Sequence, residues 1–161
     1  MSHYGVRDAD VTCAALLHDV VEDHAAELGG GPGRAGQEAA LAALAAQFGL
    51  RVAALVGAVT NPPHVPGRDP HEQYREHVAE SLRGSPWARV IKASDFTDNG
   101  VGLIHTTAGP RLRRLAGKYA PLVPVLRELI AQSDTPLGDQ ARQRILAQLD
   151  RAADRFSAIL G

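Results

Sequence analysis

The strongest constraint on the fold is that apolar residues recur at helical spacing, while no stretch alternates β-branched and polar residues as a strand would. Val52, Leu55, Val56 and Val59 fall on one side of a helix, and alanine, leucine and arginine, which are strong helix formers, are abundant. Clusters of glycine and proline separate these segments. We therefore predict an all-α globule of about seven helices. The predicted spans are 8–28, 35–48, 50–60, 71–82, 86–103, 110–133 (or two helices, if Pro121 or Pro124 interrupts it) and 139–160.

Length and charge narrow the class of protein. A chain of 161 residues predicts a single domain over 1–161, with the motif-bearing core at about 8–130 and a C-terminal helix at about 139–160. The 17 basic and 18 acidic residues give a net charge of −1, which disfavours a nucleic-acid or membrane-surface partner. No apolar run is long enough to span a membrane, no signal peptide is visible, and the single cysteine, Cys13, indicates a reducing compartment. We expect a cytoplasmic protein.

The segment 16–23 concentrates three carboxylates and an imidazole. Like charges this close repel one another, and the repulsion is smallest when a cation lies among them. A His-Asp pair offers nitrogen and oxygen ligands to a divalent ion, and two further carboxylates could act on a water molecule there. The alternative is a solvated acidic face of an amphipathic helix. On a continuous helix, the polar arc holds His18, Asp19, Glu22 and Asp23, and the opposite apolar arc holds Ala14, Leu17, Val20 and Val21.

A second polar stripe lies on the predicted helix 86–103. Lys92, Asp95 and Asn99 fall within a narrow arc of this helix. A cation, an anion and an amide suit a phosphate contact, a metal ligand and a hydrogen-bonding group. The alternative is an i,i+3 ion pair between Lys92 and Asp95 beside an exposed asparagine.

In this order, the two segments resemble the motifs of the HD-domain metal-dependent phosphohydrolases. The closest similarity is to the hydrolase domain of the RelA/SpoT alarmone enzymes and to their small stand-alone relatives. Residues 16–23 read LLHDVVED, and a later helix carries a lysine, an aspartate three residues on and an asparagine four further on. Tyr74-Arg75 and the segment 118–122 also stand where such proteins carry similar residues. The resemblance covers roughly residues 8–130.

The resemblance implies an all-α fold, one divalent cation, most often Mn²⁺, and a reaction that removes pyrophosphate from the 3′ position of guanosine tetra- or pentaphosphate, (p)ppGpp. In the family two histidines and two aspartates hold the metal, carboxylates position the attacking water, and a lysine and an asparagine orient phosphate or ribose. Carried over by position, these are the metal ligands His18, Asp19 and Asp95, the catalytic Glu22 and Asp23, and the substrate-binding Lys92 and Asn99.

Two departures from the family pattern keep other functions open. The family's first metal histidine lies on a helix upstream, and here His3 is the only histidine before His18. Phe96 stands where an arginine is usual. We interpret the chain as lacking the family's first helix, which would expose apolar surface and favour a homodimer. The alternatives are a catalytically degenerate HD module that binds a nucleotide or a partner without turnover, and a phosphatase acting on ordinary nucleoside monophosphates.

Overall fold

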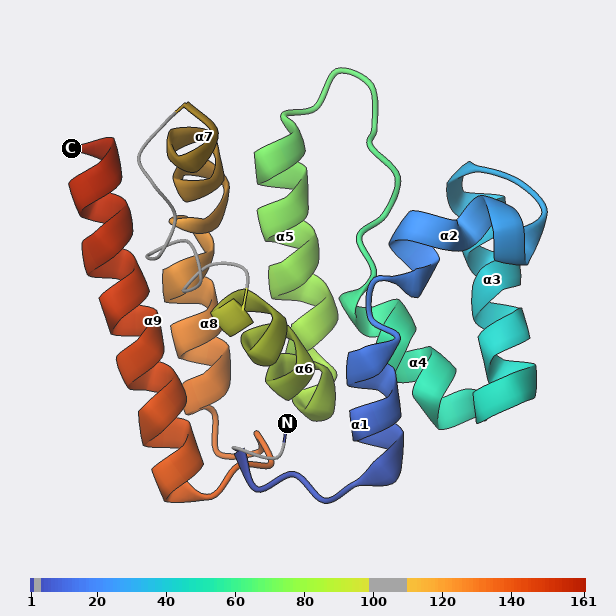
Figure 1. The fold of residues 1–161 in the computed structure, drawn as a ribbon, viewed down its shortest axis with the longest axis horizontal. Coiled ribbons are helices and arrows are strands. Elements are labelled where there is room, and N and C mark those ends of the chain that lie inside the picture. The colour runs from blue at the N-terminus through green and yellow to red at the C-terminus, as the bar shows by residue number, and fades with distance from the viewer. Residues whose placement is uncertain (2–3, 99–109) are drawn as a thin grey trace.

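The computed structural model describes residues 1, 4–98 and 110–161, and every regular element within them is a helix (Figure 1). The predicted all-α fold is therefore confirmed. No described helix combines the length and the apolar character that crossing a membrane requires. The nine helices of the described residues are α1 (Ala9–Leu16), α2 (Val20–Gly29), α3 (Gly33–Phe48), α4 (Leu50–Val59), α5 (Pro70–Arg83), α6 (Pro86–Phe96), α7 (Pro110–Tyr119), α8 (Leu122–Ala131) and α9 (Asp139–Leu160).

Helix α6 is the centre of the fold. It packs against α1, α4, α5 and α8, so it joins the two sides of the molecule seen in Figure 1. Pro86 occupies its first turn, where a missing N–H breaks no helical hydrogen bond. Its buried residues include not only apolar side chains but also Arg89 and Lys92. The charged groups of α6 are thus presented inside the molecule.

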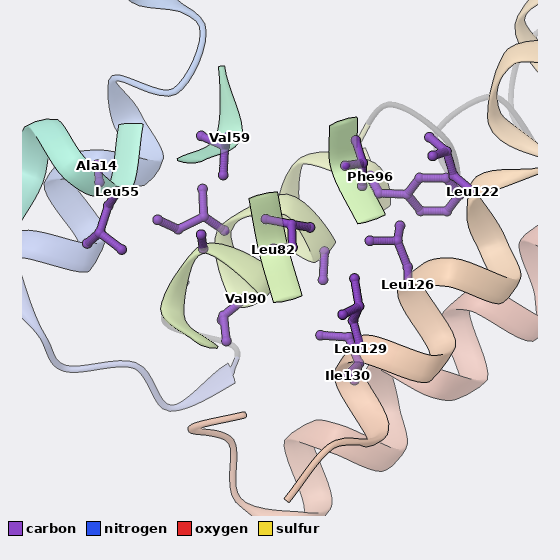
Figure 2. Packing of buried hydrophobic residues seen from close by; sticks show 14 of the residues in the cluster. Ala14, Leu55, Val59, Leu82, Val90, Phe96, Leu122, Leu126, Leu129 and Ile130 are labelled. Atoms are coloured by element: carbon purple, nitrogen blue, oxygen red, sulfur yellow. The ribbon is translucent and has the colours of Figure 1, made fainter. Parts of the chain in front are cut away.

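One cluster of buried apolar residues draws on all nine of these helices. Its centre, around Leu82 of α5, Val90 of α6 and Leu126 of α8, is shown in Figure 2. Phe96 lies edge-on to Tyr119 and to Phe156, with ring centroids 5.8 and 6.3 Å away. Such pairs contribute about 1 kcal/mol each beyond the area they bury. Phe96 is therefore a core residue that ties α6 to α7 and α9.

The predicted helix 8–28 is two helices in the structure. Helix α1 ends at Leu16, and α2 begins at Val20 after a turn that contains Leu17, His18 and Asp19. The prediction of one continuous helix with one polar face is therefore wrong. The break places Glu22 in the first turn of α2, where the positive end of the helix stabilises a carboxylate.

The predicted helix 110–133 is also divided, since α7 ends at Tyr119 and α8 begins at Leu122. Pro121 precedes α8 as its N-cap, and Pro124 lies in its first turn, where its ring removes no helical hydrogen bond. These two divisions account for nine helices where seven were predicted. The predicted helix 86–103 ends at Phe96, and residues 99–103 lie outside the described part of the chain.

Two contacts fix the helices that lead to the turn at 17–19. The Asp8 carboxylate caps α1 by accepting hydrogen bonds from the backbone N–H groups of Asp10 and Val11 at 3.1 and 3.2 Å. It also accepts from Arg51 of α4, with Oδ2 2.6 Å from Nη2. Replacing such a cap with alanine costs about 1 kcal/mol. The predicted start of the first helix at Asp8 is confirmed.

Helices α2 and α3 touch through glycine. A Cβ atom built on Gly29 would lie 2.1 Å from the Gly36 carbonyl oxygen, and one built on Gly36 would lie 1.7 Å from the Gly31 oxygen. Gly30, which follows α2, adopts φ 72°, a left-handed conformation that glycine reaches without strain. The close approach of the two helices depends on these residues having no side chain.

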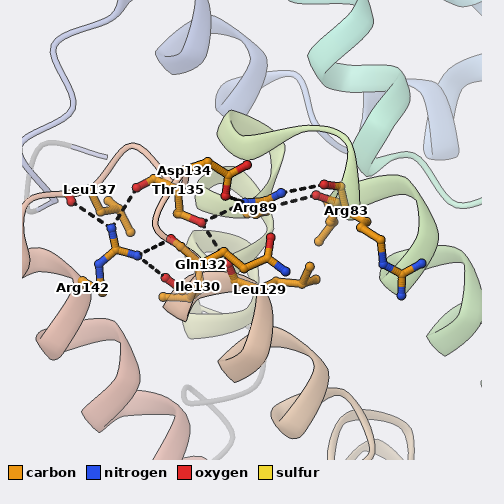
Figure 3. A network of polar contacts seen from close by, with 10 residues as sticks. Arg83, Arg89, Leu129, Ile130, Gln132, Asp134, Thr135, Leu137 and Arg142 are labelled. Atoms are coloured by element: carbon orange, nitrogen blue, oxygen red, sulfur yellow. Dashed lines mark hydrogen bonds and ion pairs between the residues drawn. The ribbon is translucent and has the colours of Figure 1, made fainter.

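A buried arginine joins α6 to the segment that follows α8 (Figure 3). The Arg89 guanidinium donates to the carbonyl oxygens of Leu82 and Arg83 at 2.8 and 2.6 Å. It also donates to Thr135 Oγ1 at 3.1 Å and to Asp134 Oδ1 at 2.5 Å. All three guanidinium nitrogens donate hydrogen bonds, so the burial of this cation is tolerated.

Arg142 of α9 makes the same kind of contact with the loop between α8 and α9. Its guanidinium donates to the carbonyl oxygens of Ile130, Gln132 and Thr135 at 2.5, 2.8 and 3.0 Å (Figure 3). Arg89 thus holds the chain between α8 and α9 against α6, and Arg142 holds it against α9.

Candidate functional site

His18 and Asp95 come from distant parts of the chain and meet where α1 packs against α6. His18 lies in the turn after α1, and its Nε2 is 3.5 Å from Asp95 Oδ1 and 3.0 Å from Asp19 Oδ2. Asp95 is nearly buried, with 12% of its side chain exposed, whereas Asp19 is 56% exposed. The site therefore has a buried floor and an open side that a small molecule can reach.

The second nitrogen of His18 defines its chemistry. Nδ1 donates a hydrogen bond to the Ala15 carbonyl oxygen at 2.9 Å, so a neutral ring carries its lone pair on Nε2. That nitrogen is buried and has no aligned hydrogen-bond partner in the described residues. The Asp95 carboxylate, which faces Nε2, raises the pKa of His18 against the effect of burial, and the charge of Asp19 adds to the increase. The carboxylates of Asp95 and Asp19 thus favour a positive charge at the position of His18 Nε2.

Lys92 is the buried neighbour of Asp95 on α6. Its Nζ lies 2.9 Å from Asp95 Oδ2, and the exposed fraction of its side chain is 7%. Burial alone would lower the pKa of Lys92, but Tyr74 and Asp95 outweigh it and raise this pKa. Burial alone would raise the pKa of Asp95, but contact with His18 and the charge of Lys92 hold it well below its usual range. Both groups are therefore charged at neutral pH.

Two aromatic rings border this ion pair. Lys92 Nζ lies 5.5 Å from the ring centroid of Tyr74, and Lys118 Nζ of α7 lies 4.8 Å from the same centroid. Lys118 is also 5.2 Å from the centroid of Tyr119. Burial raises the pKa of Tyr74 to about 12, and the charge of Lys92 opposes this effect. Tyr74 thus stays neutral, and both ammonium groups contact its ring.

Glu22 is held in place by Asn61, which follows α4. The Asn61 backbone N–H donates to Glu22 Oε1 at 2.7 Å, and its side-chain Nδ2 donates to Oε2 at 3.0 Å. The negative charge of Glu22 contributes to raising the pKa of Lys92 and opposes the effect of burial on the pKa of His77. The Glu22 carboxylate is therefore near the Lys92–Asp95 ion pair. Asp23 is exposed and makes no hydrogen bond or ion pair through its side chain with the described residues.

The donor set can be tested against a divalent cation. Ligands lie about 2.0–2.2 Å from such an ion, so neighbouring ligand atoms are about 3 Å apart. The separations from His18 Nε2 to Asp19 and Asp95 have this magnitude. A backbone hydrogen bond to the other ring nitrogen is the usual support of a metal-ligating histidine. As they stand, however, the described residues contain no group of three or more His, Cys, Asp or Glu side chains arranged to hold a metal ion. The three side chains therefore fit part of a coordination shell.

A pocket of about 290 Å³ adjoins this site. It lies between the loop after α4, the start of α5 and the end of α7. Asn61 and Tyr74, which touch Glu22 and Lys92, both line it, as does Lys118. The centre around His18 and the pocket are therefore neighbours.

The structure brings together most of the residues singled out in the sequence. His18, Asp19, Asp95 and Lys92 form one connected group. The ion pair between Lys92 and Asp95, which the spacing had left as an alternative, exists, and Asp95 also faces His18. Asn99, like the upstream His3, lies outside the described residues.

Three further residues were not assigned a role from the sequence. Asn61 holds Glu22 partly through its backbone, which no sequence motif reveals. Tyr74 and Lys118 stand within segments that resemble the family, but only the packing of α5 near α7 brings them to one ring contact.

Comparisons of the chain with protein-family models, with curated proteins and with solved structures gave no match.

Proposed function

We propose that this protein is a divalent-metal phosphohydrolase of the HD type, with Mn²⁺ as its cation. Its substrate would be a nucleotide with a 3′-diphosphate, (p)ppGpp first. The observation that carries the proposal is the buried Nε2 of His18, which has its other ring nitrogen fixed by Ala15 and faces the carboxylates of Asp19 and Asp95. An imidazole lone pair between two carboxylates is a donor set for a divalent ion.

A cation held by His18, Asp19 and Asp95 would lower the pKa of a water molecule and offset phosphate charge. Lys92 keeps Asp95 ionised and fixes one of its oxygens, so the other stays directed at His18. Glu22, which the two hydrogen bonds from Asn61 hold in one orientation, is the carboxylate available to accept a proton from the attacking water. Asp23, in the same turn of α2, is free to bind or orient solvent at the open side.

The site stands close to solvent, which suits a small-molecule substrate. Asp19 and Glu22 are at the surface, whereas Lys92 and Asp95 form the floor. The free thiol of Cys13 agrees with a reducing compartment, and we propose that the protein acts in the cytoplasm.

The test measures pyrophosphate release from guanosine tetraphosphate with added Mn²⁺. Turnover that falls at least a hundredfold in His18→Ala and in Asp95→Ala would support the proposal. His24→Ala is the matched control, because His24 is an exposed histidine on α2 whose ring, among the described residues, pairs with Glu27. It should retain full activity.

Binding of Mn²⁺ is measured separately by titration calorimetry on the same variants. A folded wild-type protein that neither binds Mn²⁺ nor hydrolyses the nucleotide would refute the proposal. Nucleotide binding without turnover would instead favour the degenerate binding module, and preferential hydrolysis of 5′-monophosphates would favour a monophosphatase.

A further inference from the structure

One stretch of the chain carries basic residues and no acidic ones. The span 99–127 contains five of the 17 basic residues and none of the 18 acidic residues. The rest of the chain therefore has more acidic than basic residues, although the net charge of the whole is only −1. Helix α7 lies within the basic span, whereas α2, with Glu22 and Asp23 in its first turn, lies on the opposite side of the molecule (Figure 1).

The first two turns of α7 carry three arginines, which we call the basic face: Arg111, Arg113 and Arg114. All three are exposed, and none forms an ion pair with the described residues. The segment 99–109, which joins α6 to α7, contains no acidic residue that could pair with them. By contrast, the exposed Arg68 is paired with Glu76. The described residues thus leave the charge of the basic face unmatched.

The position of the basic face does not stabilise the helix. A helix N-terminus carries a partial positive charge, so cations in its first turns are unfavourable there. Arg111 and Arg114 are three residues apart, and Arg114 and Lys118 are four apart, so these like charges repel one another along one side of α7. An anion bound at this face removes both unfavourable interactions.

Gly117 leaves the centre of the basic face without a side chain. On the helix, its direction falls between those of Arg113 and Arg114, one turn further along. A Cβ atom built on Gly117 would meet no atom of the other described residues within 4 Å, so packing gives no reason for a glycine, which destabilises a helix interior. The backbone of a bound chain can therefore approach α7 closely at this point.

The chemistry of the basic face favours carboxylates on a protein segment. Arginine pairs with a carboxylate through two parallel N–H···O bonds, and clusters of arginine are a recurring means of recognising acidic motifs. A nucleic acid fits less well. A strand that extends beyond the ten residues of α7 would meet a chain in which acidic residues outnumber basic ones. Its bases would also find no exposed ring on α7, since Tyr119 is half-buried and contacts Phe96.

We propose that the basic face of α7 binds an acidic segment of a partner protein. The three arginines pair with carboxylates of that segment, and Gly117 lets its backbone lie against the helix. The inference does not depend on the proposed function, because no side chain of the basic face contacts the candidate centre around His18 among the described residues.

Fluorescence anisotropy with a labelled peptide of eight glutamates tests this surface. The wild-type protein should bind the peptide, and raising the NaCl concentration from about 50 to about 300 mM should weaken binding at least fivefold, because salt screens exposed charges. A labelled peptide of eight glutamines should not bind. The triple variant Arg111→Gln, Arg113→Gln and Arg114→Gln should weaken binding of the glutamate peptide at least tenfold.

A second triple variant is the matched control. It replaces three exposed arginines outside α7 with glutamine, so it removes the same charge: Arg7, Arg34 and Arg83. Its affinity for the glutamate peptide should change less than twofold. Both variants alter only exposed side chains and should remain folded by circular dichroism. If the α7 variant does not, Arg113→Gln alone replaces it, with at least a twofold loss expected.

Three outcomes would overturn the inference. The first is a wild-type protein that does not bind the glutamate peptide. The second is an equal loss of binding in the two triple variants, which would assign the attraction to overall charge. The third is an oligouridylate of eight nucleotides that binds at least as tightly as the peptide and is lost in the α7 variant, which would assign the face to a nucleic acid.

Discussion

Helix α6 carries two buried cations one turn apart, and they have opposite surroundings. Arg89 is enclosed by two main-chain carbonyls, a threonine hydroxyl and one carboxylate. Lys92 faces an aromatic ring and the carboxylate of Asp95, which it shares with His18. Main-chain carbonyls within a packed fold cannot move away, whereas a shared carboxylate can change partners. The first cation therefore holds the fold together, and the second pairs with a carboxylate that also faces His18.

The largest expected effect follows from removing the enclosed cation. Arg89→Met should lower the free energy of unfolding by about 3 kcal/mol, because the carbonyls of Leu82 and Arg83 lose their partner in a buried place. Urea unfolding followed by circular dichroism measures the change. Arg127→Met, which breaks an exposed ion pair with Asp150, is the control and should cost under 1 kcal/mol. Equal losses in the two variants would remove the distinction between the buried and the exposed arginine.

A smaller effect is expected at the second cation, and it should be reversible. Asp95→Ala leaves the Lys92 ammonium buried without its carboxylate and should lower the free energy of unfolding by about 2 kcal/mol. Adding Lys92→Met to this variant should restore most of the loss, since an apolar side chain replaces an unpaired charge. Urea unfolding in the presence of a chelator makes the comparison independent of metal. Strictly additive losses in the double variant would argue against a coupled pair.

The smallest effect concerns the pH dependence of the Arg89 network. The Arg89 guanidinium holds the pKa of Asp134 below its usual value. Since the pKa is lower in the folded protein, the interaction stabilises the fold above the unfolded pKa of about 4 and is lost as the pH falls through the folded value. Asp134→Asn should therefore unfold at a slightly lower urea concentration than the wild type at pH 6 and at the same concentration near pH 2. A difference that persists at the lower pH would assign the effect to packing.

Most helices could be predicted from the sequence, but the break between α1 and α2, where His18 lies, could not. Asp8 and Pro86 signalled helix starts through their capping and turn chemistry, and the structure has helices there. The turn at 17–19 contains neither glycine nor proline, so local propensity gave no reason to divide the helix. The break is favoured by tertiary contacts, such as those that hold His18 and Glu22.

The candidate site was predictable to the extent that it is local. Lys92 and Asp95 are three residues apart on a helix, so their pairing follows from spacing alone. The meeting of His18 with Asp95, and of Lys118 with Tyr74, depends on how separate helices pack. Those contacts were available from the sequence only through resemblance. The role of Asn61 was not predicted, because it depends on the loop after α4 lying beside α2 and acts partly through a backbone N–H.

The glycine contact between α2 and α3 makes the protein sensitive to substitution at two residues that have no side chain. Positions 29 and 36 leave no room for even a methyl group, so a single Gly-to-Ala change would force the two helices apart. Glu22 lies at the other end of α2 from Gly29, and a tilt of this helix would draw its carboxylate away from Asn61. A substitution that leaves every candidate site residue unchanged could in this way disrupt the site, because it would displace the helix that carries Glu22.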